Sequence, residues 1–127
     1  MRINIFDKET SVDENIIEAS EEEIRRQVEE YSKAERKAFD LALVFPDSFT
    51  GRVMREMIKI PYGETRSYGE ISDSLGTAPI AVGQACGRNP VPIIVPCHRV
   101  VGKNALGGYS GGLGLKKKLL ELEGADF

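Results

Sequence analysis

Residues 67–88 read SYGEISDSLGTAPIAVGQACGR, and this stretch decides the fold of the larger part of the chain. Ser67, three residues before Glu70, is typical of a capping box that begins a helix, and Gly76 is suited to end that helix. Pro79 is well placed in the first turn of a second helix. Two short helices joined by a glycine-containing turn predict a helix-turn-helix.

The second of these helices, expected over residues 80–87, has little side-chain bulk. Ala81, Gly83, Ala85 and Gly87 leave a nearly bare backbone surface, at some cost in intrinsic helix stability. Such a surface lets another group approach the backbone closely. Composition alone leaves two interpretations equally open, because the partner is either another element of the protein or a ligand.

A further helix is expected on each side of this unit. The first should be short and should end at Pro61-Tyr62-Gly63. After the unit, a glycine-rich loop at 107–112 precedes a last helix over about 115–123, which Gly124 is suited to cap. The short helix has one apolar side, which is made of Val53, Met54, Met57 and Ile58.

The start of the chain has a different pattern. Residues 1–6 alternate apolar and polar side chains, which indicates a short strand, and Asn15–Ala19 is the expected partner strand. Ser20 with Glu23 predicts the start of a helix from about 21 to 38. Pro46 breaks the pattern and places a boundary at 46. The apolar stripe of the helix consists of Ile24, Val28, Tyr31, Ala38 and Leu41.

The composition is that of a globular protein with one core. Of 127 residues, 41% are hydrophobic and 29% charged. The first 50 residues contain 13 of the 20 acidic and 7 of the 17 basic residues, a net charge of −6, whereas the rest carries +3. A positive carboxy-terminal part permits contact with nucleic acid. No signal peptide or membrane span is visible, so we expect a cytoplasmic protein.

The residues with reactive side chains cluster late in the chain. The apolar run VPIIVPCHRVV at 91–101 ends in Cys97-His98-Arg99, which is unusual for a buried strand. Pro96 predicts that Cys97 lies where an extended segment turns. Neighbouring histidine, arginine and helix amides would favour the reactive thiolate. An inert buried cysteine, and a disulfide or metal site shared with Cys86, are the alternatives.

This segment resembles a known active site. The sequence PCHRV at 96–100 resembles the active-site motif of the O6-alkylguanine-DNA alkyltransferases, which are also called methylated-DNA–protein-cysteine methyltransferases. Further segments resemble the family in the same order and spacing: Asn89-Pro90 with the VPI that follows, GYSGGL at 108–113, and residues 121–124. The resemblance extends from about Phe49 to Gly124.

The resemblance implies DNA repair by a methyltransferase that acts once. The alkyl group of O6-alkylguanine, with O4-alkylthymine as a further candidate substrate, would pass irreversibly to Cys97. It implies no metal and no organic cofactor. The expected partner is double-stranded DNA, bound through the minor groove with the alkylated guanine flipped out. We expect a monomer that binds no membrane.

The resemblance also assigns roles in catalysis. Cys97 would be the alkyl acceptor, His98 would act through a bridging water, and Glu123 would orient His98. Tyr68 would donate a proton to the guanine O6 as the base departs. The backbone carbonyls of Cys97 and Val100 would hold the exocyclic amine. Without the resemblance, Tyr68 and Glu123 would be interpreted as a neighbour of a helix cap and a surface carboxylate.

The remaining roles concern binding. The Ser110 amide would contact the guanine O6, Tyr109 would line the pocket, and Asn89 would tie the helix-turn-helix to the active-site segment. The bare helix would enter the minor groove. The residues expected to contact DNA are Ile80, Ala81, Gly83, Gln84, Arg88 and Arg99.

The expected fold is α+β overall. A mainly helical carboxy-terminal domain at 47–127, with a winged-helix-like helix-turn-helix, holds the alkyltransferase site, and residues 1–46 form an abbreviated amino-terminal α/β part. Two features depart from the family. The amino-terminal part is short, which rules out the zinc site of some members, and Ile80 stands where the family has a DNA-intercalating arginine.

Two other functions compete with alkyl transfer. An alkyltransferase-like protein would bind the lesion without efficient transfer, but such proteins typically have another residue in place of Cys97. A transcriptional helix-turn-helix would need basic side chains that read bases, and the second helix offers mainly Gln84 and Arg88.

Overall fold

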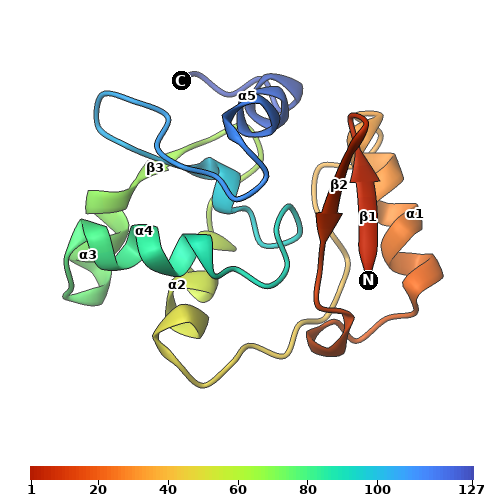
Figure 1. The fold of residues 1–127 in the computed structure, drawn as a ribbon, viewed down its shortest axis with the longest axis horizontal. Helices are drawn as coiled ribbons and strands as arrows, with labels where there is room; N and C mark the ends of the chain where they lie inside the picture. Colours follow the sequence, from red (N-terminus) through yellow and green to blue (C-terminus); the bar gives the residue numbers. More distant parts are fainter.

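The computed structural model describes residues 1–127 as a mixed α+β fold with two small sheets (Figure 1). The first hairpin and helix lie on one side of the molecule, and the helices of the middle of the chain lie on the other. In chain order the elements are β1 (Arg2–Ile5), β2 (Lys8–Ser11), η1 (Glu14–Ile16), α1 (Glu21–Ser32), α2 (Phe49–Met57), β3 (Arg66–Ser67), α3 (Tyr68–Leu75), α4 (Pro79–Gly87), η2 (Cys97–Arg99), β4 (Val100–Val101) and α5 (Leu113–Leu122).

The amino-terminal sheet is a tight hairpin. β1 is a strand as predicted, but it pairs antiparallel with β2 and not with Asn15–Ala19. Phe6 and Asp7 form the turn, with positive φ angles of 50° and 62°. A two-residue turn of this kind matches the strand twist and closes the hairpin at once. The predicted partner is therefore wrong, and Glu14–Ile16 forms a 3₁₀ helix.

Helix α1 begins where its capping residues predicted, but it ends early. The Ser20 side chain accepts a hydrogen bond from the Glu23 amide. The helix stops at Ser32, because Ala34 takes a left-handed conformation with φ of 59°. The predicted extension to residue 38 is wrong.

The segment after α1 folds back along the helix. The buried Gln27 side chain donates to the Asp40 carbonyl (3.1 Å) and accepts from the Asp40 amide (2.9 Å). These two bonds satisfy a backbone that has no helical partners of its own. Ala38 and Leu41 thus lie beside the helix and do not extend its apolar stripe.

The helix-turn-helix forms as predicted from its capping residues. Both bonds of the capping box are present, from the Glu70 amide to Ser67 Oγ and from the Ser67 amide to Glu70 Oε1, each 3.0 Å. Gly76 ends α3 with φ of 67°, a left-handed conformation that glycine adopts without steric cost. Pro79 is the first residue of α4. Helices α3 and α4 pack against each other.

Helix α2 supports this unit from below in Figure 1. Val53, Met54 and Met57 are completely buried, as the apolar pattern predicted. Ile58 was expected on the same side, but 43% of its surface is exposed. Ile58 is the C-cap residue of the helix and keeps helical backbone angles, so its exposure shows that the core does not extend past the last turn of α2.

The apolar run before Cys97 is a turn and not an extended segment. The Val95 amide donates to the Val91 carbonyl (2.9 Å), and Ile93 has a φ of 76°. The expectation of an extended segment is therefore corrected. After η2 the chain enters β4, which pairs in parallel with β3. This pairing brings the start of α3 next to the Cys97 segment.

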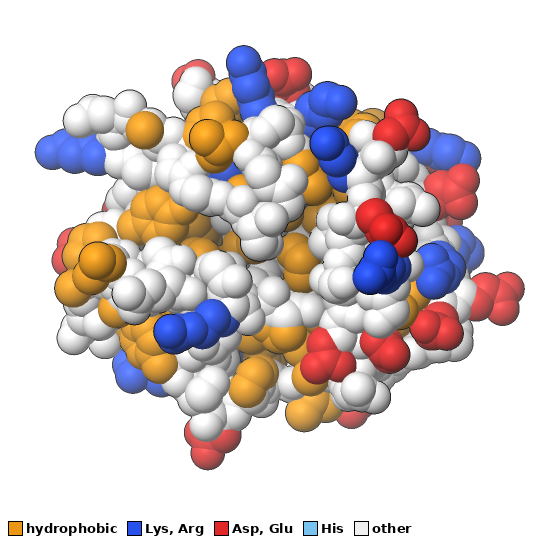
Figure 2. Space-filling model, in the orientation of Figure 1, with side chains coloured by type: hydrophobic (Ala, Val, Ile, Leu, Met, Phe, Trp, Pro, Cys, Tyr) orange, Lys and Arg blue, Asp and Glu red, His pale blue; other side chains and the backbone are white.

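One hydrophobic core runs through both parts of the chain. The 22 buried hydrophobic residues of the cluster include Ile3 and Ile24 from the amino-terminal part and Ile71 and Val100 from the carboxy-terminal part. The division at residue 46 stays a prediction. In Figure 2, charged side chains gather most densely on the side of the amino-terminal part. None of the helices is long and apolar enough to cross a membrane.

Candidate active site

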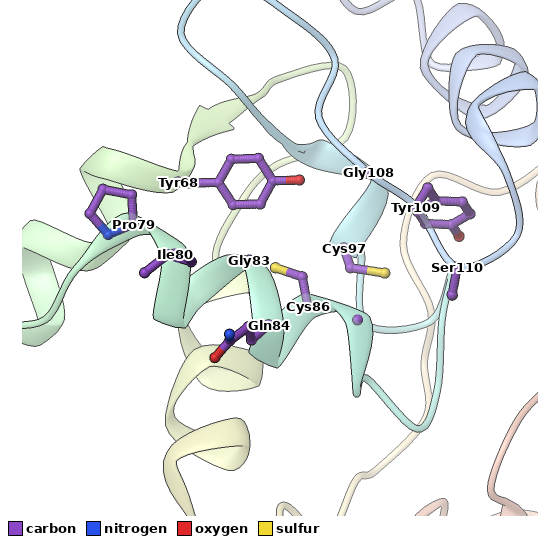
Figure 3. Close-up of a pocket in the computed structure, with 11 residues that line it drawn as sticks. Tyr68, Pro79, Ile80, Gly83, Gln84, Cys86, Cys97, Gly108, Tyr109 and Ser110 are labelled. Atoms are coloured by element: carbon purple, nitrogen blue, oxygen red, sulfur yellow. The ribbon is translucent and has the colours of Figure 1, made fainter.

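A cavity of about 590 Å³ opens between α4, the start of α3 and the loop before α5 (Figure 3). Cys97 and Tyr68 line it, and the exposed face of α4 forms one side. The cavity therefore joins a thiol, a phenol and an accessible helix. The predicted site residues that line it are Cys97, Tyr68, Tyr109, Ser110, Ile80, Gly83 and Gln84.

Cys97 is a buried thiol at the wall of this cavity. It is the first residue of η2 and only 4% of its surface is exposed. Burial raises the pKa of the Cys97 thiol, although Asn89 and the charge of Lys116 act in the opposite direction. The resting group is therefore the protonated thiol, and it needs a base to become a nucleophile. The groups that favour the thiolate are thus Asn89 and Lys116 and not the histidine and arginine that the sequence suggested, and burial outweighs them.

Asn89 ties the end of α4 to the segment that carries Cys97. Its side-chain amide donates to the Val95 carbonyl (2.9 Å), and its oxygen accepts from the Val91 amide (3.1 Å). Asn89 is nine-tenths buried. These contacts match the bridging position expected for Asn89, and they fix the turn that leads into η2.

Behind Cys97 lies a buried histidine–carboxylate pair. His98 Nε2 and Glu123 Oε2 are 2.7 Å apart, and neither side chain is exposed. Burial would raise the pKa of Glu123, but hydrogen bonds from His98 and Arg99 lower it to about 2. The ionised Glu123 accepts a hydrogen bond from Nε2–H of His98. The proton of the neutral ring therefore sits on Nε2, and Nδ1 is the basic atom of the ring. Nδ1 is buried and has no protein partner.

Arg99 belongs to the same buried cluster and not to the DNA-facing surface. Its Nε donates to Glu123 Oε1 (2.8 Å) and its Nη2 to Glu123 Oε2 (2.9 Å). Its Nη1 donates to the Ile60 carbonyl (2.7 Å). Only 7% of Arg99 is exposed. The predicted contact with DNA is therefore wrong: the guanidinium neutralises a buried carboxylate.

Two further groups that the sequence did not reveal bind Glu123. The Tyr31 hydroxyl, from α1, donates to Glu123 Oε2 (2.5 Å) and lies 3.5 Å from His98 Nε2. The Gly63 amide donates to Glu123 Oε1 (3.2 Å). Tyr31 had been interpreted only as part of an apolar stripe. A tyrosine within such a stripe is the one local signal, since a buried hydroxyl requires a partner.

Lys116 was also missed. It is completely buried on α5, and its Nζ donates to the carbonyls of Val100 (2.6 Å) and Gly108 (3.1 Å) and lies 3.5 Å from the Tyr68 hydroxyl. Burial lowers the pKa of Lys116, and an ionised Cys97 or Cys86 would oppose this. Val100, expected to bind a guanine amine, does not line the cavity, and its carbonyl already accepts from Lys116.

Tyr68 points across the cavity from the first turn of α3 (Figure 3). Burial, and then the nearby thiols of Cys86 and Cys97, raise the pKa of Tyr68 to about 12. The phenol is thus protonated near neutral pH and has a proton to give. Gly107 leaves space for it, because a Cβ at residue 107 would lie 2.5 Å from the Tyr68 hydroxyl oxygen.

The outer face of α4 is open. Ile80 is 73% exposed, and Gln84 and Arg88 are exposed as well. A Cβ added to Gly83 would approach only Tyr68, at 3.9 Å, and one added to Gly87 would meet nothing within 4 Å. Ala85, by contrast, is completely buried and packs within the core, so only Ala81, Gly83 and Gly87 leave a surface that is open to a ligand. Ala81, on the same helix, is partly exposed.

The second cysteine does not pair with the first. Both Cys86 and Cys97 are free, and Cys86 Sγ contacts Met57 Sδ at 3.7 Å while facing the cavity. Burial raises the pKa of Cys86 to about 12. No three or more His, Cys, Asp or Glu side chains group together as a metal site requires.

Comparison with known proteins agrees with the site. Residues 48–125 match the sequence model of the 6-O-methylguanine DNA methyltransferase DNA-binding domain. The chain belongs to this family. Over 113 residues it is 48% identical to the methylated-DNA–protein-cysteine methyltransferase of Archaeoglobus fulgidus, which covers 84% of the chain and 77% of that protein.

Two further relatives cover less of their own length. A methyltransferase of the same description from Methanocaldococcus vulcanius is 58% identical over 60% of the chain and 47% of its own length. The crystal structure of a Mycobacterium tuberculosis OGT in complex with DNA superimposes with a TM-score of 0.74 at 50% identity, over 77% of the chain and 62% of that protein. The chain thus spans about half to two thirds of these two relatives.

Proposed function

We propose that this protein repairs DNA by transferring the alkyl group of O6-alkylguanine to the Sγ atom of Cys97, once per molecule. O4-alkylthymine is the second candidate substrate. The observation that carries the proposal is the meeting of three features at one cavity: the Cys97 thiol, the Tyr68 phenol, and an exposed helix face where Gly83 and Gly87 leave the backbone accessible. The methyltransferase names of the relatives agree with this chemistry.

The reaction is a displacement at the alkyl carbon. The Cys97 sulfur forms a bond to that carbon while the bond from carbon to the guanine O6 breaks. Because burial keeps the resting thiol protonated, the sulfur must lose its proton as it attacks. The product is a thioether, which is a stable group. The Cys86 thiol lines the same cavity, but burial raises its pKa to about 12, so near neutral pH it is protonated and is not a nucleophile that could remove the alkyl group.

His98 receives the thiol proton at Nδ1. This atom is buried without a protein partner, whereas Nε2 is held by Glu123. Adjacent side chains along a chain diverge, so a bridging water is the natural carrier from Sγ to Nδ1. The resulting imidazolium faces the ionised Glu123, which stabilises it. No cofactor takes part in any of these steps.

Tyr68 protonates the leaving guanine. Its hydroxyl lies at the cavity, and its raised pKa of about 12 keeps the proton available until negative charge develops on O6. Lys116 Nζ lies 3.5 Å from that hydroxyl and would stabilise the phenolate that remains. The Ser110 amide and the Tyr109 ring, at the opposite wall, contact the base.

The open face of α4 binds double-stranded DNA through the minor groove. Its small residues allow the helix backbone to approach the groove closely, while Gln84 and Arg88 are exposed and can reach the DNA. The damaged nucleotide is flipped into the cavity, since a base inside a duplex cannot reach Cys97. Ile80, at the mouth of the cavity, acts as an apolar wedge. The protein acts as a monomer.

Intact-mass analysis tests the proposal. The protein is mixed with a duplex that contains one O6-methylguanine, and the same duplex with unmodified guanine serves as the control. We expect the mass of a single methyl group to be added, at Cys97, in the first mixture only. DNA binding without any added mass after long incubation would indicate a protein that binds the lesion without transferring the alkyl group.

A further inference from the structure

We propose that Tyr31 is a positioning residue of the alkyl-transfer site, which acts through Glu123 to keep His98 ready as a base. The inference rests on the function proposed above. Tyr31 lies in α1, ahead of the residues that match the family's DNA-binding domain. The amino-terminal part would therefore contribute directly to the chemistry.

The contact is built into the core. Tyr31 has no exposed surface. Its ring lies against Phe39, with 5.4 Å between centroids, and edge-on to Tyr62, at 6.1 Å. Its hydroxyl has one strong acceptor, Glu123 Oε2. The packing of the ring thus fixes where the hydroxyl donates.

Tyr31 and His98 share one oxygen of Glu123. Oε2 accepts from the Tyr31 hydroxyl and from His98 Nε2, and it also receives Nη2 of Arg99. Each donor withdraws electron density from the carboxylate. Each therefore weakens the hydrogen bonds that the carboxylate accepts from the other donors. The Tyr31 hydroxyl therefore reduces the pull of Glu123 on a protonated His98.

The other charges around His98 act in known directions. Burial lowers the pKa of His98, the Glu123 carboxylate raises it, and the positive charges of Arg99 and Lys116 lower it. The Cys97 thiol adjoins it in sequence, and the Tyr62 phenol faces the cluster from the loop before β3. Burial raises the pKa of Tyr31 far above its ordinary value, so it remains a neutral donor throughout the working pH range.

These relations define the role. Glu123 stays in place without Tyr31, because Arg99 binds both of its oxygens and the Gly63 amide binds Oε1. Tyr31 instead lowers the basicity of the His98–Glu123 pair. With the hydroxyl present, His98 is a neutral imidazole with Nδ1 free to receive the thiol proton. Without it, His98 should become protonated too early as pH falls.

The test compares Tyr31→Phe with Tyr62→Phe. Both changes remove one phenol hydroxyl from the same aromatic cluster and keep the ring, but the Tyr62 hydroxyl donates to the Leu122 carbonyl (3.3 Å) and not to Glu123. His98 is the only histidine in the chain, so its ring nitrogens give unambiguous NMR signals. Those signals distinguish the Nε2–H form from the doubly protonated ring.

We expect Tyr31→Phe to raise the midpoint of His98 protonation by about one pH unit. The pH at which single-turnover reaction with free O6-benzylguanine falls to half of its alkaline rate should rise by the same amount relative to the unmodified protein. Tyr62→Phe should change neither measurement. Identical nitrogen signals and pH profiles in the two variants would overturn the proposal.

A second substitution covers the case in which Tyr31→Phe fails to fold. Incorporation of 3-fluorotyrosine at residue 31 keeps the ring and hydroxyl but makes the hydroxyl a stronger donor, so the His98 midpoint should fall. A midpoint that rises or stays constant contradicts the proposal. If the unmodified protein never gains alkyl mass on Cys97, the proposed function fails. The NMR signals still test whether the hydrogen bond from Tyr31 to Glu123 lowers the protonation midpoint of His98.

Discussion

The two sides of the cavity are organised in opposite ways. On the inner side, the Glu123 carboxylate receives hydrogen bonds from Tyr31, Gly63, His98 and Arg99, and these groups come from three separate parts of the chain. On the outer side, α4 presents small side chains and the exposed Ile80. The side chains of the inner side are held by hydrogen bonds to other parts of the protein, whereas the exposed side chains of α4 are open to solvent.

This difference indicates how the work is divided. A buried, hydrogen-bonded cluster holds proton donors and acceptors in one arrangement and leaves His98 Nδ1 without a protein partner, which is what proton transfer to that atom requires. An open helix face satisfies nothing internally and is available for a partner that fits it. Substitutions on the inner side should therefore change chemistry and stability, and substitutions on the outer side should change recognition of DNA.

The largest expected effect separates chemistry from recognition at a single atom. Cys97→Ala removes the nucleophile, so alkyl transfer should be abolished. Binding to a duplex with O6-methylguanine should stay within about threefold, because one thiol is a small part of the contact surface. Intact mass measures transfer, and fluorescence anisotropy measures binding. Loss of binding in a folded Cys97→Ala protein would show that the two sides are not separable.

The second effect concerns the inner side. Glu123→Gln places an amide among donors and leaves Arg99 buried without its anion, which should reduce the free energy of unfolding by about 3–5 kcal/mol. Chemical denaturation measures it, and Glu121→Gln, at an exposed position of α5, is the matched control. Equal stability of the two variants would mean that the cluster contributes nothing to the fold.

The same variant has a pH signature. Folding lowers the pKa of Glu123 from its ordinary value near 4.5 to about 2, so its stabilisation is complete above 4.5. That stabilisation is lost as pH falls from 4.5 toward 2, while the carboxylate becomes protonated in the unfolded chain and then in the folded one. Glu123→Gln should therefore lose less stability over this range than the unmodified protein.

Tyr68→Phe tests the proton donor without changing the ring. Alkyl transfer should slow by roughly one to three orders of magnitude, the usual contribution of a general acid. Single-turnover rates on duplex DNA measure it, with unchanged DNA affinity as the control for correct folding. A rate equal to that of the unmodified protein would remove Tyr68 from the mechanism.

The smallest expected effect lies on the outer side. Ile80→Arg supplies a side chain that can fill the space of the flipped base and hydrogen-bond its orphaned partner, so duplex repair should become faster by about two- to tenfold. Reaction with free O6-benzylguanine, which needs no flipping, should stay constant. Ile58→Arg adds the same charge at an exposed position of α2 and should not accelerate repair. A flat or slower duplex rate for Ile80→Arg would mean that isoleucine is already an adequate wedge.

The parts of the fold that follow from short-range rules were predictable. The Ser67–Glu70 capping box, the Gly76 stop and the start at Pro79 all act within a few residues, and all three were found. The hairpin partner and the end of α1 were missed. They depend on positive φ angles at Phe6 and Ala34, which are not glycine and give no warning in the sequence.

The site shows the same division. The motif around Cys97 located the cavity, but it misplaced Arg99 at the DNA surface, because sequence adjacency does not tell which way a side chain points. Tyr31 was missed because its partner lies far away in the chain: Tyr31 is 92 residues from Glu123. Lys116 was missed because its partners at Val100 and Gly108 are backbone carbonyls, which leave no pattern in the sequence. Pairings over such distances arise only when the core closes.

That separation has a consequence for the order of synthesis. While the chain is being made, Tyr31, His98 and Arg99 all emerge before Glu123. Until Glu123 emerges, burial of Arg99 is unfavourable because its charge has no carboxylate partner. The cluster must assemble after residue 123 has left the ribosome, in one step with the docking of α5. A nascent chain therefore already contains Cys97 before the His98–Glu123 pair beside it can form, and that pair forms only when α5 has docked.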